Sequence, residues 1–486
     1  MRRRLGIVAL TAAALVGIVA VFRRTRLAGP INRTTRAGRN LELARLGVAV
    51  GSTYATANAR KLFASAARRA ELSEAARLRT AEQVAERLGN MKGALMKVGQ
   101  MASYLDDGLP EPVRQALAAL QAAAPPMSGD LAAEVVEREL GRTPTELFVE
   151  WDPDPIAAAS IGQVHRAVAI DPATGDERAV AVKVQYPGVG DAIESDLANT
   201  ELLGTLLKQG FGGLDPADMV AEIRERITEE LDYAHEAANQ QRFAAFYRGH
   251  PFIHIPAVLP SLSTGRVLTS ELVVGTPWRE VLGWEQHQRD LAGEALFRFV
   301  FRSLYTMRAF NGDPHPGNYL FHGDGKITFL DFGLVRYFSV EELATFASMV
   351  RTAAVEHDAA AFRRIVEEAG LLRRGAPVPT AEAGEYFSQF YEPVARDRAM
   401  TWTPEYASAI VRHTFDRTSP IAQYATVPRA FVFIQRINLG LYALLGDLRA
   451  TGNYRRMAEE LWPFAHGAPS TPLGEAEAAW LRVRGA

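Results

Sequence analysis

One short segment gathers oxygen-bearing side chains at spacings that suit phosphoryl transfer. In GDPHPGNYLFHGDGKITFLDFG, residues 312–333, Asp313 and Asn318 lie in a loop constrained by proline and glycine, and Asp331 follows a short apolar run. Phosphoryl transfer uses a carboxylate near the attacking hydroxyl and oxygen ligands that hold Mg²⁺ against nucleotide phosphates. We therefore expect Asp313 to be the catalytic base, and Asn318 and Asp331 to be the metal ligands.

The same spacings occur in protein kinases, where D-x-x-x-x-N is followed by D-F-G. Taken alone, Asp313 and Asn318 would also fit as turn formers, because both residue types are common beside glycine and proline. The D-F-G that begins at Asp331 outweighs that alternative, since all elements occur in the kinase order. The segment therefore predicts a kinase-like catalytic loop.

A phosphate-binding loop is expected upstream of that site. AAASIGQV, residues 157–164, aligns with the glycine-rich kinase loop and retains Gly162 and Val164, but Ala157 and Ala159 replace the first two glycines. Alanine restricts the backbone and its approach to phosphate, so this loop should orient the phosphates differently. The predicted nucleotide-binding residues are Ala157, Ala158, Ala159, Ser160, Gly162 and Val164.

A lysine with a helical glutamate partner completes the kinase inventory. Lys183 ends an A-V-K sequence that matches the strand lysine of V-A-I-K, and it would contact the α- and β-phosphates. Alone, it would more naturally be an exposed lysine on a strand edge. Segment 219–243 supplies several glutamates, of which Glu230 is our first choice as the partner of Lys183 and Glu236 the second.

The adenine should bind to the connection between two lobes. RVLTSELVVG, residues 266–275, is expected to form a strand and hinge. By register, main-chain groups of Glu271 and Val273 would contact the base, with Ser270 as the gatekeeper.

NMKGALMKVGQMASYLDD, residues 90–107, is expected to form an amphipathic helix. Lys97 lies about 100° from the centre of its apolar stripe, which alone would fit a solvated lysine beside a core face. Gly99 weakens the helix by about 1 kcal/mol relative to alanine but permits close approach of a neighbouring backbone.

The order of these motifs resembles that of the UbiB/AarF/ADCK family of atypical protein-kinase-like proteins. The resemblance covers roughly residues 85–460, including a distal segment at 429–448, and excludes the amino terminus. The motifs that carry it are K-V-G-Q at 97–100, A-A-A-S at 157–160, E-L-D at 230–232, Asp313 with Asn318, and D-F-G at 331–333.

The resemblance implies a regulatory role for the K-x-G-Q helix. In that family this extension folds over the nucleotide and substrate cleft, so Lys97 should point at Glu230 or Glu236, and Gln100 toward the nucleotide region. It also implies ATP or ADP with Mg²⁺, a membrane lipid or quinone-like isoprenoid as ligand, and lipid-biosynthesis proteins as partners. The implied role is ATP hydrolysis in support of ubiquinone or other isoprenoid-lipid biosynthesis.

The amino terminus predicts a membrane anchor. Leu5 to Phe22 contains no charged residue, is flanked by arginines, and reaches roughly 27 Å as a helix. A cleaved signal peptide or a buried helix would be the alternatives, but basic residues follow directly and an A-x-A site is missing. Arg33, Arg36 and Arg39 predict that the body of the protein stays on the cytoplasmic side.

Composition excludes several other classes of site. Lys plus Arg total 54 against 56 Asp plus Glu, so no global field favours nucleic acid. The sequence contains no cysteine, which removes disulfides, thiolate nucleophiles and Cys-ligated metals. The histidines, including His315 and His322, form no metal-ligand pattern, and we expect His315 to organise its loop.

The expected fold is α+β, a bilobal protein-kinase-like fold with a helical N-terminal extension and a single N-terminal membrane-anchor helix. Alternating apolar runs within 156–185 predict two strands joined by a polar loop, and the pattern before Gly141 predicts a helix over 129–140. The predicted segments are an anchor at 1–30, an extension at 31–130, an N-lobe at 131–275, a C-lobe at 276–470 and a tail at 471–486.

Two other functions fit part of the pattern. GDPHPGN also resembles the G-D-x-H-x-x-N loop of small-molecule phosphotransferases, although the A-A-A-S and K-x-G-Q elements argue against that class. A nucleotide-sensing scaffold without turnover is the non-enzymatic alternative. Phosphate transfer to a small alcohol would support the first, and nucleotide binding without hydrolysis would support the second.

Overall fold

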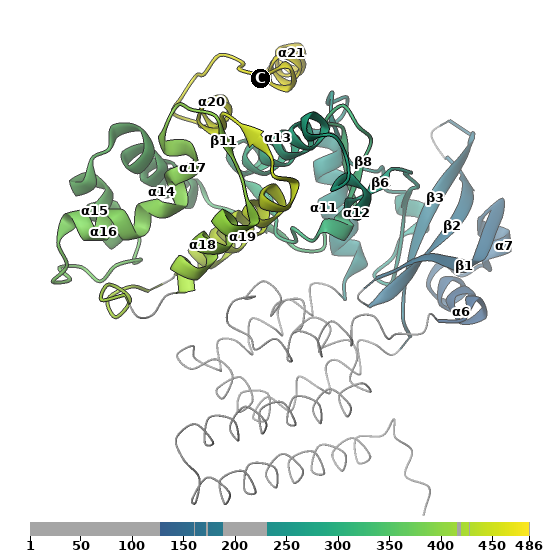
Figure 1. Cartoon of the computed structure of the whole chain (residues 1–486). Coiled ribbons are helices and arrows are strands. Elements are labelled where there is room, and N and C mark those ends of the chain that lie inside the picture. Colours follow the sequence, from purple (N-terminus) through teal and green to yellow (C-terminus); the bar gives the residue numbers. More distant parts are fainter. Residues whose placement is uncertain are drawn as a thin grey trace, which may run out of the picture. The chain divides into compact units, whose positions relative to one another are not determined.

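The computed structural model describes residues 127–159, 161–171, 174–187, 231–415, 419–426 and 428–485. An antiparallel sheet in its first part is followed by a largely helical unit (Figure 1). Several predictions lie outside the described residues: the anchor at 1–30, the extension up to residue 126 with its helix at 90–107, Lys97, Gln100, Ser160 and Glu230. The boundaries proposed for the domains stay predictions.

The sheet has the strand order β1-β2-β3-β5, with all neighbours antiparallel. Alternation along β3 places Val180, Val182 and Val184 in a buried core and directs Lys183 to the other face. The strands and the two helices that pack on the valine face are β1 (Glu150–Ala158), β2 (Gly162–Ile170), β3 (Glu177–Gln185), β5 (Val267–Glu271), α6 (Gly129–Leu140) and α7 (Pro144–Leu147).

The helix predicted at 129–140 is confirmed as α6. The Ser128 hydroxyl accepts a hydrogen bond from the Leu131 amide at its start, and Gly141 ends it with a left-handed φ of 74°. The two strands predicted within 156–185 are confirmed as β2 and β3.

Strand β1 was not predicted, because Pro153 and Pro155 argue against a strand. The structure tolerates them because β1 is the edge of the sheet and its register is interrupted on both sides of Pro155.

A second sheet joins the amino-terminal part to the helical part. Its order is β4-β9-β8-β6, and β4, which lies in the sequence between α11 and β5, pairs in parallel with β9. Strand β9, which lies just before Asp331, is therefore hydrogen-bonded to β4, the strand that follows α11. These elements are α11 (Tyr233–Phe246), β4 (Ile253–His254), β6 (Thr276–Pro277), β8 (Tyr319–Phe321) and β9 (Ile327–Phe329).

The helical unit surrounds a large aromatic and aliphatic core. Short turns at Pro260–Leu262 (η1), Pro316–Asn318 (η3) and Gln389–Tyr391 (η5) are 3₁₀ helices, and η2 (Ser303–Met307) and η4 (Arg351–Glu356) are π-helical. The paired short strands are β7 (Ala309–Asn311) with β10 (Val335–Tyr337), and β11 (Met400–Thr401) with β12 (Thr451–Gly452). The helices are α12 (Trp278–Val281), α13 (Gln286–Arg302), α14 (Val340–Val350), α15 (Ala359–Glu368), α16 (Thr380–Ser388), α17 (Glu392–Ala395), α18 (Pro404–Phe415), α19 (Arg429–Leu448), α20 (Tyr454–Glu459) and α21 (Pro472–Arg484).

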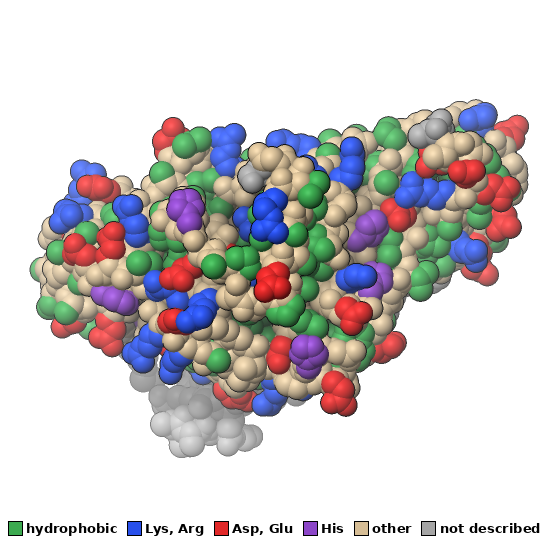
Figure 2. Space-filling model, turned by 90° about the horizontal axis from the view of Figure 1, so that it is seen from above, with side chains coloured by type: hydrophobic (Ala, Val, Ile, Leu, Met, Phe, Trp, Pro, Cys, Tyr) green, Lys and Arg blue, Asp and Glu red, His purple; other side chains and the backbone are tan. Residues whose placement is uncertain are grey.

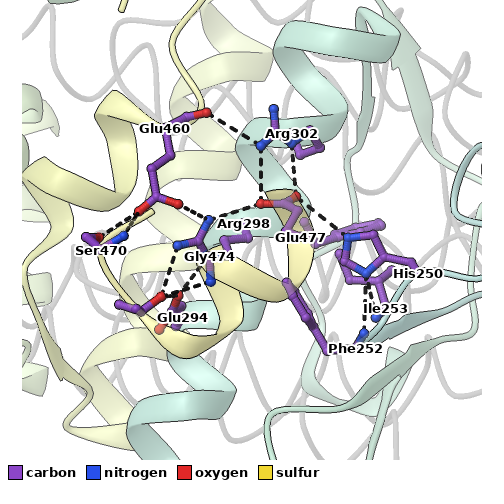
Figure 3. Close-up of polar contacts among 12 residues, drawn as sticks. His250, Phe252, Ile253, Glu294, Arg298, Arg302, Glu460, Ser470, Gly474 and Glu477 are labelled. Atoms are coloured by element: carbon purple, nitrogen blue, oxygen red, sulfur yellow. Dashed lines mark hydrogen bonds and ion pairs between the residues drawn. The ribbon is translucent and has the colours of Figure 1, made fainter. Parts of the chain in front are cut away.

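The segment predicted as a tail is a packed helix. Residues 472–484 form α21, and the Glu477 carboxylate lies between Arg298 and Arg302 of α13 (Figure 3). Helix α21 is held by these ion pairs, by Leu473 in the core and by the ring contacts of Trp480.

Among the described helices, the stretch Phe431–Leu448 of α19 is long and apolar enough to cross a bilayer, but 65% of it is buried within the protein. It packs against α13 and α18 and belongs to the core of the helical unit.

On the face drawn in Figure 2, basic and acidic side chains are interspersed.

Candidate active site

Lys183 of β3 and Glu236 of α11 form the central ion pair. The Lys183 Nζ donates to both carboxylate oxygens of Glu236 at 2.9 Å, and the side chains are 18% and 5% exposed. Such a pair fixes the ammonium at the position where it can contact nucleotide phosphates. The predicted role of Lys183 thus has the geometry that it needs.

Asp331 forms an ion pair with the same Lys183 ammonium. Its Oδ2 is 3.4 Å from the Lys183 Nζ, and the Tyr233 ring lies 4.9 Å from that nitrogen. Burial alone would lower the pKa of Lys183, but the carboxylates of Asp331 and Glu236 outweigh it and raise the pKa well above its usual range. Lys183 is therefore a fixed cation at this site.

Between the two glutamates considered for Lys183, the structure places Glu236 on it. The Asp232 carboxylate accepts from the amides of Ala234 and His235, so α11 begins at Tyr233 and Glu236 lies in its first turn, facing the protein interior. The E-L-D motif at 230–232 predicted Glu230 as the partner of Lys183, and Glu230 lies outside the described residues. The helix-capping pattern of Asp232 was the signal that favours Glu236.

The position of α11 is coupled to the D-F-G segment. Phe332 is fully buried against Phe243 of α11, with ring centroids 4.9 Å apart. Asn239 of α11 donates to the Phe332 carbonyl at 3.1 Å and accepts from the Tyr337 hydroxyl at 2.8 Å. In kinases the packing of this phenylalanine separates active from inactive arrangements. Here Phe332 lies under α11 while Asp331 faces Lys183.

Glu236→Gln is expected to lower the pKa of Lys183 and to reduce nucleotide-dependent turnover by about 10- to 100-fold, because the ammonium loses its closest negative partner. Measuring turnover together with the pH dependence of acylation at Lys183 tests both effects. Glu280→Gln, a change at an exposed glutamate, is the control. A Glu236→Gln variant with unchanged turnover and acylation would contradict the assignment.

The start of the catalytic loop is held to the D-F-G segment by two hydrogen bonds. The Asn311 side chain donates to the Asp331 carbonyl at 2.6 Å, and the Gly312 amide donates to the Leu334 carbonyl at 2.7 Å. Asp313 comes directly after this anchored pair. Asn311 was not among the predicted residues, although it directly precedes the motif.

The end of the loop is closed by Asn318 and His315. The Asn318 side-chain nitrogen donates to the Asp313 main-chain carbonyl at 3.3 Å, and the Asn318 main-chain carbonyl accepts from the Leu330 amide at 2.9 Å. The His315 Nδ1 accepts from the Gly317 amide at 3.1 Å, which confirms that this histidine organises the loop.

The predicted base and metal ligands converge near Tyr319. Burial first, and then the carboxylates of Asp313 and Asp331, raise the pKa of the Tyr319 hydroxyl above its usual range. The Asp331 Oδ1 accepts from the Gly333 amide at 3.0 Å, while its Oδ2 faces Lys183. Asn318 is hydrogen-bonded to Asp313 and to Leu330, the residue before Asp331, and the roles of Asp313, Asn318 and Asp331 stay predictions.

The donor set fits Mg²⁺ bound together with a nucleotide. Among the described residues, no group of three or more His, Asp or Glu side chains could hold a metal ion by itself. Mg²⁺ commonly takes one or two protein oxygen ligands and completes its shell with phosphates and water. A carboxylate from Asp331 and an amide oxygen from Asn318 meet that requirement.

The alanine-rich segment lies at the end of β1 and is hydrogen-bonded to the start of β2. Ala157 and Ala158 belong to β1, and the Ala159 amide donates to the Gly162 carbonyl at 2.9 Å. Val164 of β2 lies directly opposite Lys183 in the sheet, so it shares that face. A Cβ at Gly162 would overlap the Val184 carbonyl. Glycine is therefore needed at 162 for close packing of the strands.

At the hinge, the Glu271 amide donates to the Ala257 carbonyl at 2.8 Å. Its carboxylate lies 3.0 Å from Arg178 and 3.4 Å from His254. The Glu271 carbonyl and the Val273 main chain remain the predicted adenine contacts. Ser270 lies opposite Ala181, which places it on the Lys183 face of the sheet.

One contact to the catalytic loop comes from far along the chain. Gly440 of α19 lies against Pro314, and a Cβ at Gly440 would overlap that ring. This close approach gives a physical reason for the distal segment at 429–448 to accompany the catalytic motifs. Its position was not deducible from the spacing within the sequence.

Comparisons with known proteins agree with this geometry. Residues 119–366 match the family described as the ABC1 atypical kinase-like domain. The atypical kinase COQ8B, mitochondrial, of Rattus norvegicus is 36% identical over 279 residues, which cover 56% of this chain and 51% of the rat protein. The atypical kinase COQ8, mitochondrial, of Saccharomyces cerevisiae is 30% identical over 288 residues, which cover 59% of this chain and 56% of the yeast protein.

A solved structure extends the match over more of the chain. Rv3197 of Mycobacterium tuberculosis, in a complex with erythromycin, is 32% identical with a TM-score of 0.59, and the match covers 82% of this chain and 99% of that one. The chain spans about half the length of the curated relatives that it matches.

Proposed function

The chain belongs to the ABC1 atypical kinase-like family, and from that premise we propose that it is a membrane-associated atypical kinase or ATPase that binds Mg²⁺ with ATP and supports ubiquinone or other isoprenoid-lipid biosynthesis. The observation that carries the catalytic part is the grouping of Lys183, Glu236 and Asp331 within hydrogen-bonding or ion-pair distance. Kinases require the lysine–glutamate pair and the D-F-G aspartate to be in place together.

Each residue has a defined task in this proposal. Lys183 would neutralise the α- and β-phosphates, while Asn318 and Asp331 would hold Mg²⁺, which offsets negative charge on the transferring phosphoryl group. Asp313 would accept the proton of an attacking water or hydroxyl that reaches it. The short connection after Ala159 would cover the phosphates.

The membrane and lipid parts of the proposal rest on the sequence. The arginine-flanked run at 1–30 would anchor the protein, with its body on the cytoplasmic side. Lys97 would compete with Lys183 for Glu236, or pair with Glu230, and Gln100 would face the nucleotide, so that the extension regulates access. Quinone-like isoprenoids and lipid-biosynthesis proteins are the partners that the family resemblance supplies.

A second candidate function is small-molecule phosphotransfer. It is favoured by one observation, since the solved relative Rv3197 is described in complex with erythromycin, a small molecule. Covalent transfer of the ATP phosphoryl group to an added alcohol, in place of release as inorganic phosphate, would identify this activity.

The test is Mg²⁺-dependent release of phosphate from ATP by the full chain in phospholipid liposomes, with and without a quinone-like phenol. Turnover that needs Mg²⁺ and rises with the phenol would support a lipid-coupled ATPase. Binding of Mg²⁺–ATP without turnover under both conditions would replace the enzymatic proposal with a nucleotide-sensing scaffold.

A further inference from the structure

Helix α21 packs against the turn that follows α11, residues 247–250. The Trp480 ring lies 4.5 Å from the His250 ring and 5.9 Å from the Phe246 ring. Its Nε1 donates to the Arg248 carbonyl at 3.2 Å, and Arg484 donates to the same carbonyl at 3.3 Å. Two side chains of α21 thus hold one main-chain oxygen just beyond the end of α11.

The first half of α21 is itself held by buried ion pairs (Figure 3). The Glu477 carboxylate is 1% exposed and accepts from Arg298 at 3.0 Å and from Arg302 at 2.9 Å. At Gly474 the α21 backbone approaches the Arg298 guanidinium so closely that a Cβ would meet its Nη2 at 2.6 Å. Arg298 and Arg302 belong to the long helix α13. Because α21 is fixed to α13 in this way, it is a rigid support for the turn.

The same turn is also held from its inner side. The Tyr247 hydroxyl is 2.7 Å from the Ser303 Oγ, and the His250 Nδ1 accepts from the Ile253 amide at 3.1 Å. Ile253 begins β4, which pairs with β9 and so leads toward Asp331. The turn is therefore the point where α11, the D-F-G strand and α21 meet.

Helix α11 connects this turn to the ion pair. About 15 Å of continuous helix separates Glu236 from Phe246 at 1.5 Å per residue. A helix of this length moves as a unit, so a displacement at Phe246 is transmitted to Glu236. In kinases the position of the corresponding helix controls whether the lysine–glutamate pair forms.

We propose that α21 is a positioning element of the nucleotide site, with Trp480 and Arg484 holding the end of α11 so that Glu236 stays on Lys183. The inference deepens the proposed function and rests on it for its effect on turnover. Its effect on Lys183 itself is measurable without any nucleotide.

The experiment compares Trp480→Ala with Val483→Ala in the full chain. Val483 is on the same helix and 90% exposed, so it is the matched control. Acylation of lysines by a small amine-reactive reagent is followed by mass spectrometry, with exposed Lys326 as the internal reference. ATP turnover, KM and the melting temperature are measured on the same samples.

In Trp480→Ala we expect Lys183 to be acylated about tenfold faster relative to Lys326, because an amine that is released from its 2.9 Å contacts with Glu236 becomes accessible to the reagent. We also expect kcat to fall by about tenfold, with Val483→Ala unchanged in both measurements. A change in melting temperature alone, with Lys183 acylation and kcat as in Val483→Ala, would show that α21 has a purely structural role and overturn the proposal.

A milder variant covers the case in which Trp480→Ala does not fold. Arg484→Ala removes one hydrogen bond to the Arg248 carbonyl and leaves the Trp480 ring in place. We expect a smaller shift in the same direction, and no shift would count against the proposal. If the wild type shows no turnover, the proposed function fails, and the acylation of Lys183 still decides the positioning role.

Discussion

Replacing Asp331 with asparagine is expected to reduce Mg²⁺-dependent ATP turnover by about 10²- to 10³-fold. A carboxylate that holds the metal contributes several kcal/mol of charge stabilisation in the transition state, and each 1.4 kcal/mol corresponds to about tenfold in rate. The Asp331 Oδ1 accepts from the Gly333 amide at 3.0 Å, and an amide oxygen can keep that bond. The ion pair between Asp331 and Lys183 is lost, but Lys183 keeps Glu236 at 2.9 Å, so the loss should fall mainly on the chemistry and the metal.

Two measurements separate these effects. Nucleotide affinity with and without Mg²⁺ should differ in the wild type, and the difference should shrink in Asp331→Asn because the metal loses its carboxylate ligand. The melting temperature should stay close to that of the wild type. Asp324→Asn, an exposed aspartate in the hairpin between β8 and β9, is the control variant. Wild-type turnover in Asp331→Asn would remove Asp331 from the catalytic site.

Glu477→Gln is expected to lower the free energy of unfolding by about 3–5 kcal/mol, the largest effect on stability that the structure predicts. Arg298 is fully buried, the Arg302 side chain is 11% exposed, and both donate to this carboxylate. Removing the negative partner leaves buried guanidinium groups without full compensation. The remaining acceptors of Arg298 are the carboxylates of Glu294 and Glu460 and the Thr471 hydroxyl.

The effect depends on pH in a defined direction. Burial alone would raise the pKa of Glu477, but His250 and the two arginines outweigh it and lower the pKa to about 2, from an ordinary value of 4.5. A depressed carboxyl pKa stabilises the folded state fully above about pH 4.5, and that contribution is lost as the pH falls toward 2. The stability difference between wild type and Glu477→Gln should therefore be constant from pH 7 to 5 and shrink below that.

Urea denaturation at several pH values checks this prediction, with Glu475→Gln as the matched variant. Glu475 is on the same helix and is exposed, so its loss should cost less than about 0.5 kcal/mol. Equal stabilities for the two variants at pH 7 would contradict the role assigned to the buried network. The comparison also isolates stability from the positioning effect expected for Trp480→Ala.

The sequence by itself predicted the chemistry of the candidate site. The spacing of Asp313, Asn318 and Asp331 predicted a kinase-like catalytic loop, because a local motif is recognised without knowledge of distant contacts. The alternating run that contains Lys183 predicted a strand, and in β3 the fixed side-chain period of two places Lys183 on the face opposite the valine core. These inferences depend on residues that are near one another in the chain.

Tertiary structure decided the contacts made over long sequence separations. Sequence reasoning ranked Glu230 before Glu236, whereas the start of α11 at Asp232 turns Glu236 toward Lys183. Residues 471–486, predicted as a tail, contain α21, which Glu477 and Trp480 hold in place through charge and ring contacts with distant segments. Ion pairs and aromatic contacts between distant segments have no spacing rule, so only the folded chain shows which residues position the site.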